Sequence, residues 1–388
     1  MEKTNIGVIG CGVIANVYLN NIKKFYKHLK VVACADIFAE KAKAMAQKYD
    51  IETVYTVAEM LMAKEVDIIL NLTIPAVHYE LNKKAILNKK NIYCEKPLAL
   101  KAKDAVCLKA LAKENGVMLG CAPDTFMGTA LQTCRRLIDE GWIGTPIGAT
   151  ANMVNHGPET WHPAPDFFYQ EGGGPMLDMG PYYITALVSL LGPVARAGCF
   201  MTKGFAKRKI YSQPRCGEEI LTEVPTHYAG LLRFENEVVA NITMSFDGWL
   251  TNLPKLEIYG TKGTLVIPDP NHFGGEIKLV RAEELIEEVE GFSNEDAIGK
   301  LSRPTMWQKY KVMPHLYRQP DSNMRGLGLA DMASALKLKR QNRASADMAC
   351  HVTEVLEALN CDGEFQAMQT TCTRPDSIPL GLDVGQFD

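Results

Sequence analysis

Two patterns of apolar residues follow one another along the chain. Up to Cys121, short β-branched runs alternate with longer stretches whose apolar residues recur at helical spacing. This alternation predicts a parallel sheet covered by helices, which is a doubly wound α/β domain. We expect its strands at 6–9, 31–35, 67–72, 92–94 and 117–120, and helices at 39–49, 57–63, 79–87 and 102–112.

The pattern changes after Pro123. Strands then follow one another with little helix between them, which favours an α+β domain with a mostly antiparallel, open sheet. We expect helices at 128–140 and 176–191, and strands at 147–154, 194–200, 226–234, 238–246, 256–259, 264–267 and 277–281. Residues 282–322 are charged and contain prolines, so we expect an irregular loop there, and helices resume at 324–340 and 344–359. The predicted domains are 1–123 and 124–388.

Composition limits the classes of partner. A chain of 388 residues exceeds what one core usually fills, which agrees with two domains. The formal net charge is only -3, so we expect a small-molecule or protein partner, and neither nucleic acid nor a membrane surface. The start of the chain lacks a signal-peptide pattern, and no apolar run approaches the roughly 20 residues of a membrane helix. The 11 cysteines form no Cys-x-x-Cys pair or Cys/His cluster. We therefore expect a cytoplasmic protein with reduced thiols and no metal site.

The first predicted strand leads directly into a glycine loop. Its sequence is Gly10-Cys11-Gly12-Val13-Ile14-Ala15, and an apolar helix follows. In a G-x-G-x-x-A turn, Gly10 permits the tight turn, Gly12 lets the backbone approach a pyrophosphate, and Ala15 keeps the helix close to the strand. The free amides at the helix start, around Val13 and Ile14, face the phosphates. The motif therefore predicts a dinucleotide site.

The second predicted strand ends in Asp36, whose carboxylate can accept hydrogen bonds from ribose hydroxyls. The next residues are Ile37 and Phe38, so no basic side chain follows at once to balance a 2′-phosphate. We expect NAD rather than NADP.

Two further motifs carry candidate chemistry. One strand ends in Glu95-Lys96-Pro97, at the carboxyl edge where doubly wound sheets bind ligands. Residues 172–183 hold three consecutive glycines, then Asp178 and Tyr182.

Together with the glycine loop, these motifs resemble the Gfo/Idh/MocA family, the glucose-fructose oxidoreductase and inositol dehydrogenase group. The resemblance covers nearly the whole chain, and it includes Thr73-x-Pro75-x-x-His78, the run 144–148, Arg325 and the run 351–355. It implies an N-terminal Rossmann domain that binds NAD, and a C-terminal domain for substrate binding and homo-oligomerisation as a dimer or tetramer.

The resemblance also implies roles for individual residues. Lys96 and Asp178 match family positions that surround the substrate alcohol, and Tyr182 stands where the family has histidine. We expect Thr73, Pro75 and His78 to line the nicotinamide or adenine path. Glu95 and Lys96 are also expected to contact the cofactor.

Which group removes the hydroxyl proton is open. Lys96 can hydrogen-bond the substrate oxygen and hold developing negative charge. Phenols have pKa values of about 10, so Tyr182 is a base only where an ammonium such as Lys96 favours phenolate. Either this pair shares the proton, or Tyr182 orients the substrate and another group is the base. His162, on the loop before the glycine run, is that alternative.

Aromatic residues indicate the substrate class. Trp161, Phe167, Phe168, Tyr169 and Tyr182 suit stacking on a pyranose ring, with Trp161 and His162 as substrate contacts. Residues 156–194 are similar to family members that oxidise glucosides at carbon 3. We expect hydride transfer between NAD and a secondary alcohol carbon of a sugar, polyol or glycoside. Two alternatives are a glycosidase that oxidises carbon 3 transiently, and a non-catalytic sensor of sugar and NAD.

Overall fold

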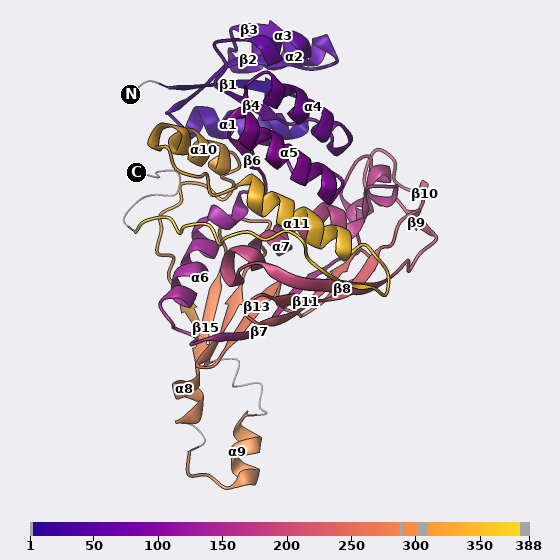
Figure 1. Ribbon diagram of the computed structural model, residues 1–388. Helices are drawn as coiled ribbons and strands as arrows, with labels where there is room; N and C mark the ends of the chain where they lie inside the picture. The colour runs from indigo at the N-terminus through magenta and orange to yellow at the C-terminus, as the bar shows by residue number, and fades with distance from the viewer. Residues whose placement is uncertain (1–2, 288–289, 302–308, 381–388) are drawn as a thin grey trace. The chain divides into compact units, whose positions relative to one another are not determined.

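The computed structural model describes residues 3–287, 290–301 and 309–380. Contacts within the chain divide it into two compact units. Figure 1 shows the chain coloured by residue number, from indigo at the N-terminus to yellow at the C-terminus. The first unit combines residues 1–127, 320–357 and 369–388, and the second combines 128–319 and 358–368.

The first unit is built on a six-stranded parallel sheet. Its strands are β1 (Thr4–Ile9), β2 (Leu29–Ala35), β3 (Thr53–Tyr55), β4 (Ile68–Asn71), β5 (Asn91–Cys94) and β6 (Leu119–Cys121). Their order is β3-β2-β1-β4-β5-β6, so the order reverses between β1 and β4. This is the doubly wound fold that the sequence predicts, and its ligand position is the carboxyl edge at that reversal.

Helices connect these strands. They are α1 (Val13–Lys24), α2 (Ala39–Tyr49), α3 (Val57–Met62), α4 (Pro75–Leu87) and α5 (Ala102–Asn115). Strand residues such as Ile6, Ile69 and Ile92 are fully buried, as expected for strands covered on both faces. The three residues of β3 are not buried, so no apolar run marks that strand in the sequence.

The last two long helices belong to this first unit. They are α10 (Leu327–Leu338) and α11 (Ala346–Ala358), and α10 packs against β5 and β6. The buried Asp124 carboxylate accepts the backbone N–H groups of Gly326 and Gly328, both at 2.9 Å, at the start of α10. The expected domain 124–388 therefore differs from the observed grouping, because residues 320–357 pack on the first sheet.

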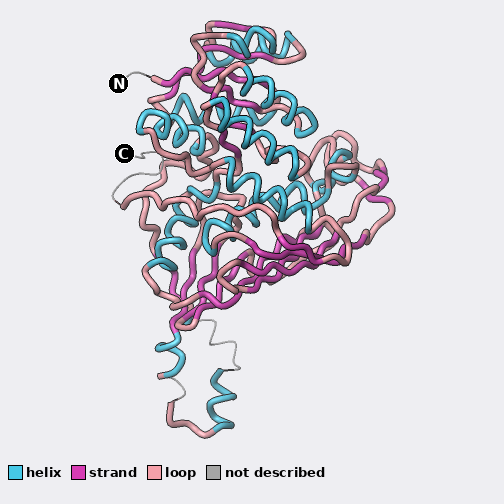
Figure 2. Tube along the Cα trace, viewed as in Figure 1, coloured by secondary structure: helices cyan, strands magenta, loops and turns pink. Residues whose placement is uncertain are grey.

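The second unit is built on a nine-stranded sheet, whose strands are magenta in Figure 2. The sheet strands are β7 (Pro146–Val154), β8 (Val194–Thr202), β11 (His227–Phe234), β12 (Val239–Ser245), β13 (Leu256–Gly260), β14 (Gly263–Ile267), β15 (Ile277–Arg281), β16 (Lys311–Met313) and β17 (Phe365–Ala367). Their order is β16-β15-β14-β13-β7-β12-β11-β8-β17, with β7 and β12 parallel and the other neighbours antiparallel. The mostly antiparallel sheet is confirmed.

Helices cover this sheet. Helix α7 (Gly174–Leu191) contacts β7, β11 and β12, and α6 (Thr129–Asp139) packs against α7 and β14. Nearly all of α7 is buried, which explains its continuous apolar sequence.

Several short elements complete the second unit. They are the 3₁₀ turns η2 (Pro158–Thr160) and η3 (Asp166–Tyr169), and a separate antiparallel pair, β9 (Lys207–Lys209) and β10 (Glu219–Leu221). Another turn, η1 (Thr125–Met127), ends the first unit's N-terminal part.

The expectation of an irregular loop over residues 282–322 is wrong in part. The structure has α8 (Ala282–Ile286), α9 (Asn294–Leu301) and β16 there, and residues 288–289 and 302–308 lie outside the described part. Helix α8 buries no side chain, so the sequence carries no helical apolar period to indicate it.

In the part of the chain that the structure describes, no helix is both long and apolar enough to cross a membrane. All 11 cysteines are free thiols, and Cys107 and Cys216 are exposed.

Candidate active site

The glycine loop joins β1 to α1, and its first glycine leaves no space for a side chain. Gly10 has φ 98°, a conformation that favours glycine, and an added Cβ would lie 2.7 Å from the carbonyl carbon and oxygen of Leu72. Gly12 precedes α1 with an ordinary φ of -83°, and an added Cβ there would meet nothing within 4 Å. Ala15 is fully buried. The loop therefore turns tightly at Gly10 and leaves open space beside Gly12.

Asp36 connects the end of β2 to this loop. Its Oδ2 accepts the Cys11 N–H at 2.8 Å, and its Oδ1 accepts the Phe38 N–H at 2.9 Å. Each carboxylate oxygen keeps a second lone pair that can accept a hydroxyl. The open space at Gly12, the uncapped start of α1 and this carboxylate fit the pyrophosphate and ribose of a dinucleotide. Around them Val13, Ile14 and Ile37 follow the loop and the strand, and Val13 is 89% exposed.

His78 contacts both the loop after β4 and the loop after β5. Its ring nitrogens lie 2.7 Å from the carbonyl oxygen of Pro97 and 2.9 Å from that of Thr73. The residue is fully buried, so it connects the two loops from inside the fold. Burial opposes the charged ring, but the Cys94 sulfur and the two carbonyl oxygens outweigh it and raise the pKa of His78 to about 9.

The two other residues of this motif shape the same turn. The Thr73 N–H and hydroxyl both donate to Asn71 Oδ1, at 3.1 and 2.7 Å, and Pro75 is the first residue of α4.

Glu95 and Lys96 follow β5, and Tyr18 on α1 holds the glutamate. The Tyr18 hydroxyl donates to Glu95 Oε1 at 2.6 Å, while Oε2 accepts the N–H of Lys96 at 3.0 Å. Burial, and then the charge of Glu95, raise the pKa of Tyr18, which stays a neutral donor. Sequence reasoning missed this residue, because an aromatic side chain on an apolar helix face is indistinguishable from core.

Asp178 and Tyr182 lie four residues apart on α7 of the second unit, and therefore on one face of that helix. Asp178 is partly exposed and Tyr182 is 9% exposed. Tyr183 is fully buried and belongs to the core.

The glycine run before α7 is tightly packed. A Cβ at Gly173 would lie 2.6 Å from the carbonyl oxygens of Phe167 and Phe168. The run thus brings the start of α7 against the segment that precedes it, and η3 contacts α7.

Residues 156–169, which we call the aromatic loop, form a cluster of rings. The His162 ring centroid lies 5.3 Å from that of Trp161 and 5.4 Å from those of Phe167 and Phe168. His162 Nδ1 accepts the N–H of Ala164 at 3.1 Å. A neutral imidazole whose Nδ1 accepts carries its proton on Nε2, which makes that nitrogen a donor. This geometry favours a donor role for His162 over a base.

The structure thus brings the predicted cofactor residues and Lys96 together in the first unit. Trp161 and His162 lie next to each other in the second unit, and Asp178 and Tyr182 lie on α7 of the same unit. Within the described residues, no group of three or more His, Cys, Asp or Glu side chains could hold a metal ion.

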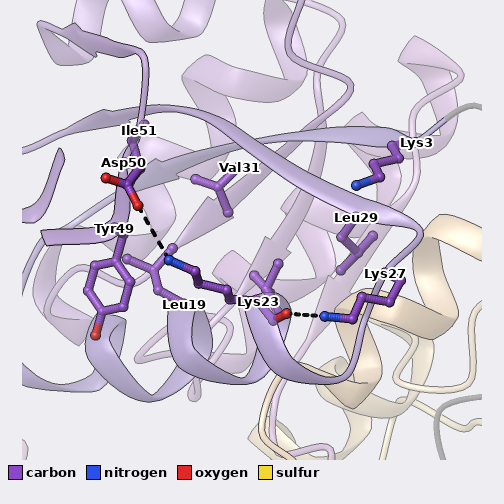
Figure 3. A pocket seen from close by; sticks show the side chains of 10 residues that line it. Lys3, Leu19, Lys23, Lys27, Leu29, Val31, Tyr49, Asp50 and Ile51 are labelled. Carbon is purple, nitrogen blue, oxygen red and sulfur yellow. Dashed lines mark hydrogen bonds and ion pairs between the residues drawn. The ribbon is translucent and has the colours of Figure 1, made fainter. Parts of the chain in front are cut away.

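A separate pocket of about 280 Å³ lies at the other end of α1 (Figure 3). Lys23 and Lys27, in and just after the last turn of α1, line it together with Leu29 of β2 and Asp50. The Lys23 Nζ lies 3.4 Å from Asp50 Oδ2. Because Gly12 precedes the first turn of α1, this pocket is distinct from the glycine-loop site.

Comparison with known sequences and structures decides the family. One family model, described as an oxidoreductase family with an NAD-binding Rossmann fold, matches residues 4–122. A second, the GFO/IDH/MocA C-terminal domain, matches residues 131–266. The chain belongs to the Gfo/Idh/MocA oxidoreductase family. The resemblance seen in the sequence and the NAD cofactor are thereby confirmed.

Curated relatives within the Gfo/Idh/MocA family act on sugars and polyols by name. An inositol 2-dehydrogenase 3 of Saccharopolyspora erythraea is 25% identical over 324 residues, 79% of this chain and 88% of the relative. A 1,5-anhydro-D-fructose reductase of Ensifer adhaerens is 27% identical over 268 residues, 67% of this chain and 74% of the relative.

A solved Gfo/Idh/MocA-like fold matches the chain almost throughout. The structure of levoglucosan dehydrogenase in complex with NADH has a TM-score of 0.74 and covers 92% of this chain and 96% of that chain. At 16% sequence identity this likeness concerns the fold.

Proposed function

We propose that the chain is an NAD-dependent dehydrogenase acting on a secondary alcohol carbon of a sugar, polyol or glycoside, with carbon 3 of a glucoside as the specific position. The observation that carries this proposal is the placement of Lys96. It follows β5 at the carboxyl edge of the NAD-binding sheet, and the part-buried hydrogen bond from Tyr18 to Glu95 holds the residue before it. A lysine ammonium beside an alcohol oxygen can hydrogen-bond that oxygen and stabilise the negative charge that develops as its proton leaves.

Roles for the other residues follow from their chemistry. NAD, when bound, supplies the hydride acceptor. The Lys96 ammonium donates to the substrate oxygen and stabilises its negative charge; as hydride leaves the carbon for NAD, the hydroxyl proton passes to Tyr182 in its phenolate form, which releases it to water. Asp178, on the same face of α7 as Tyr182, accepts a neighbouring hydroxyl and orients the ring. His162 donates from Nε2, because its Nδ1 accepts the Ala164 N–H.

The substrate class rests on the aromatic loop. Trp161 is 65% exposed, and its ring packs edge-on against His162 and Phe168 with centroids 5.3 and 6.3 Å apart. An exposed indole supported from behind offers a flat apolar surface, which suits the C–H face of a pyranose.

Assembly and compartment are further parts of the proposal. Phe200, Leu231 and Val239 are exposed on strands of the nine-stranded sheet, and a homo-oligomer of two or four copies would cover such side chains. A cytoplasmic location stays a prediction.

The test is turnover with a panel of glucosides, polyols and free sugars in the presence of NAD. We expect NADH absorbance together with a product two hydrogens lighter by mass spectrometry. Lys96→Met should lower kcat by roughly 10²–10⁴-fold, the usual range for a group that assists proton transfer. Lys103→Met, at an exposed lysine of α5, is the matched control and should leave turnover unchanged.

Other outcomes would redirect the proposal. Glycoside cleavage without net NADH would show the glycosidase that works by transient oxidation. Tight NAD binding without any turnover would show a sensor.

A further inference from the structure

The pair of strands β9 and β10 stands apart from both large sheets. They pair only with each other among the described strands, and the chain reaches them between β8 and β11. We call residues 207–221 the clamp hairpin, because its side chains and amides contact the aromatic loop at several points.

The central contact is a buried ion pair. Arg208 Nε donates to Glu159 Oε1 at 2.7 Å, and Arg208 is 4% exposed while Glu159 is fully buried. The same guanidinium donates to the carbonyl oxygen of His156 at 2.7 Å and to Asp247 Oδ1 at 2.7 Å. The Tyr169 hydroxyl also donates to Glu159. One cation thus joins the beginning of the aromatic loop to the hairpin and to the segment after β12.

Further contacts from the hairpin hold the loop at three of its residues, Glu159, His162 and Asp166. The N–H groups of Tyr211 and Ser212 donate to the Glu159 carbonyl oxygen at 2.9 and 3.2 Å. The Ser212 hydroxyl donates to the carbonyl oxygen of His162 at 2.5 Å. Arg215 forms a forked pair with Asp166, with Nη2 lying 3.2 Å from Oδ1.

The positions of these contacts matter. They lie at residues 159, 162 and 166 of the aromatic loop, so they hold the backbone of His162 and the chain on both sides of Trp161. An exposed indole on an unsupported loop would have to be ordered when a ligand binds, at a cost in conformational entropy. Contacts made before binding remove that cost and fix the ring orientation.

Resting on the proposed function, we infer that the clamp hairpin is a specificity element. Arg208 and Ser212 are positioning residues that hold Trp161 and His162 in place for the sugar ring.

The test compares four variants of the full chain by steady-state kinetics and by hydrogen exchange of residues 156–169. Ser212→Ala removes one hydrogen bond and should raise KM for the glycoside about five-fold, with kcat and NAD affinity unchanged. Amide exchange in the aromatic loop should become faster. Arg208→Met should show larger effects of the same kind, because it leaves two carboxylates without their cation.

Two controls share the hairpin. Ser212→Thr keeps the hydroxyl and should restore wild-type KM. Lys207 is on the same strand as Arg208, and Lys207→Met breaks its exposed ion pair with Glu219. This variant should change neither KM nor the amide exchange of the aromatic loop.

The result that overturns the inference is wild-type KM and wild-type exchange in Ser212→Ala. Faster exchange with unchanged KM also overturns it, since the hairpin would then stabilise the loop without a role in substrate recognition. If Arg208→Met fails to fold, Ser212→Ala still tests whether the clamp hairpin affects substrate recognition. Absence of turnover by the wild-type chain with every carbohydrate overturns the proposed function instead, and the exchange measurement tests the clamp independently.

Discussion

Both ring nitrogens of His78 face backbone carbonyl oxygens, although a neutral imidazole carries only one N–H. Only the imidazolium donates to both oxygens, which agrees with a pKa of about 9. Protonated His78 therefore connects the loop after β4 to the loop after β5, and both loops carry residues of the proposed site.

This residue gives the protein a pH dependence of stability. The folded pKa lies above the usual value of 6.5, so the stabilisation is complete below about pH 6.5 and is lost as the pH rises through about 9. The shift corresponds to about 3 kcal/mol in the free energy of unfolding. We expect urea unfolding between pH 6 and 10 to show this loss, and His78→Gln to flatten the pH dependence over that range. If the free energy of unfolding fell with pH as steeply in His78→Gln as in the wild type, His78 would not be the source of this pH dependence.

Residues in motifs could be placed from the sequence, while residues that support them could not. Gly10, Asp36 and Lys96 stand in local patterns with a known consequence. Tyr18 is 77 residues from Glu95, and Arg208 is 49 residues from Glu159. No local spacing predicts such pairs.

At the scale of elements, the β1–α1 turn carries the dinucleotide prediction. Its two glycines have different reasons to be glycine. A side chain at Gly10 would clash with the backbone at Leu72, whereas a side chain at Gly12 would enter open space.

The two positions should therefore respond differently to alanine. Gly12→Ala should keep the free energy of unfolding within about 0.5 kcal/mol and raise the Kd for NAD at least about ten-fold, because the methyl group occupies the space of the pyrophosphate. Gly10→Ala should lower the free energy of unfolding by about 2–4 kcal/mol through strain and overlap.

Gly116→Ala provides the comparison for strain alone. Gly116 has φ 67° and an added Cβ would meet nothing within 4 Å, so we expect a loss of only about 1 kcal/mol and unchanged NAD affinity. Urea unfolding and NAD titration measure both quantities. Unchanged NAD affinity in Gly12→Ala would contradict the placement of the pyrophosphate.

Long elements were predictable because their apolar periods are long. Helices α1, α2 and α4 to α7, and strands β7, β8, β11 and β12, are such elements. Strands β3, β9, β10, β16 and β17 have three residues each, too few to show an alternation of two. Strand β6 is equally short, but its three residues are all buried and continue the repeating order of strands and helices before it. Helix α8 buries nothing, so it leaves no apolar stripe.

At the scale of the whole molecule, the chain returns to its first unit. Helices α10 and α11 follow the antiparallel strands in sequence, which suggests that they belong with them. Their burial against the first sheet depends on long-range contacts such as Asp124 with Gly326 and Gly328, 202 and 204 residues away.

The measurement that tests the central claim most directly follows a single hydrogen. The wild-type chain is incubated with NAD and a glucoside carrying deuterium on carbon 3, and the nucleotide is analysed by mass spectrometry. We expect reduced nucleotide that contains one deuterium, together with the 3-keto product, and neither in Lys96→Met. Reduced nucleotide without deuterium would contradict carbon 3 as the hydride donor, and no reduced nucleotide with this or any other labelled sugar or polyol would contradict the dehydrogenase itself.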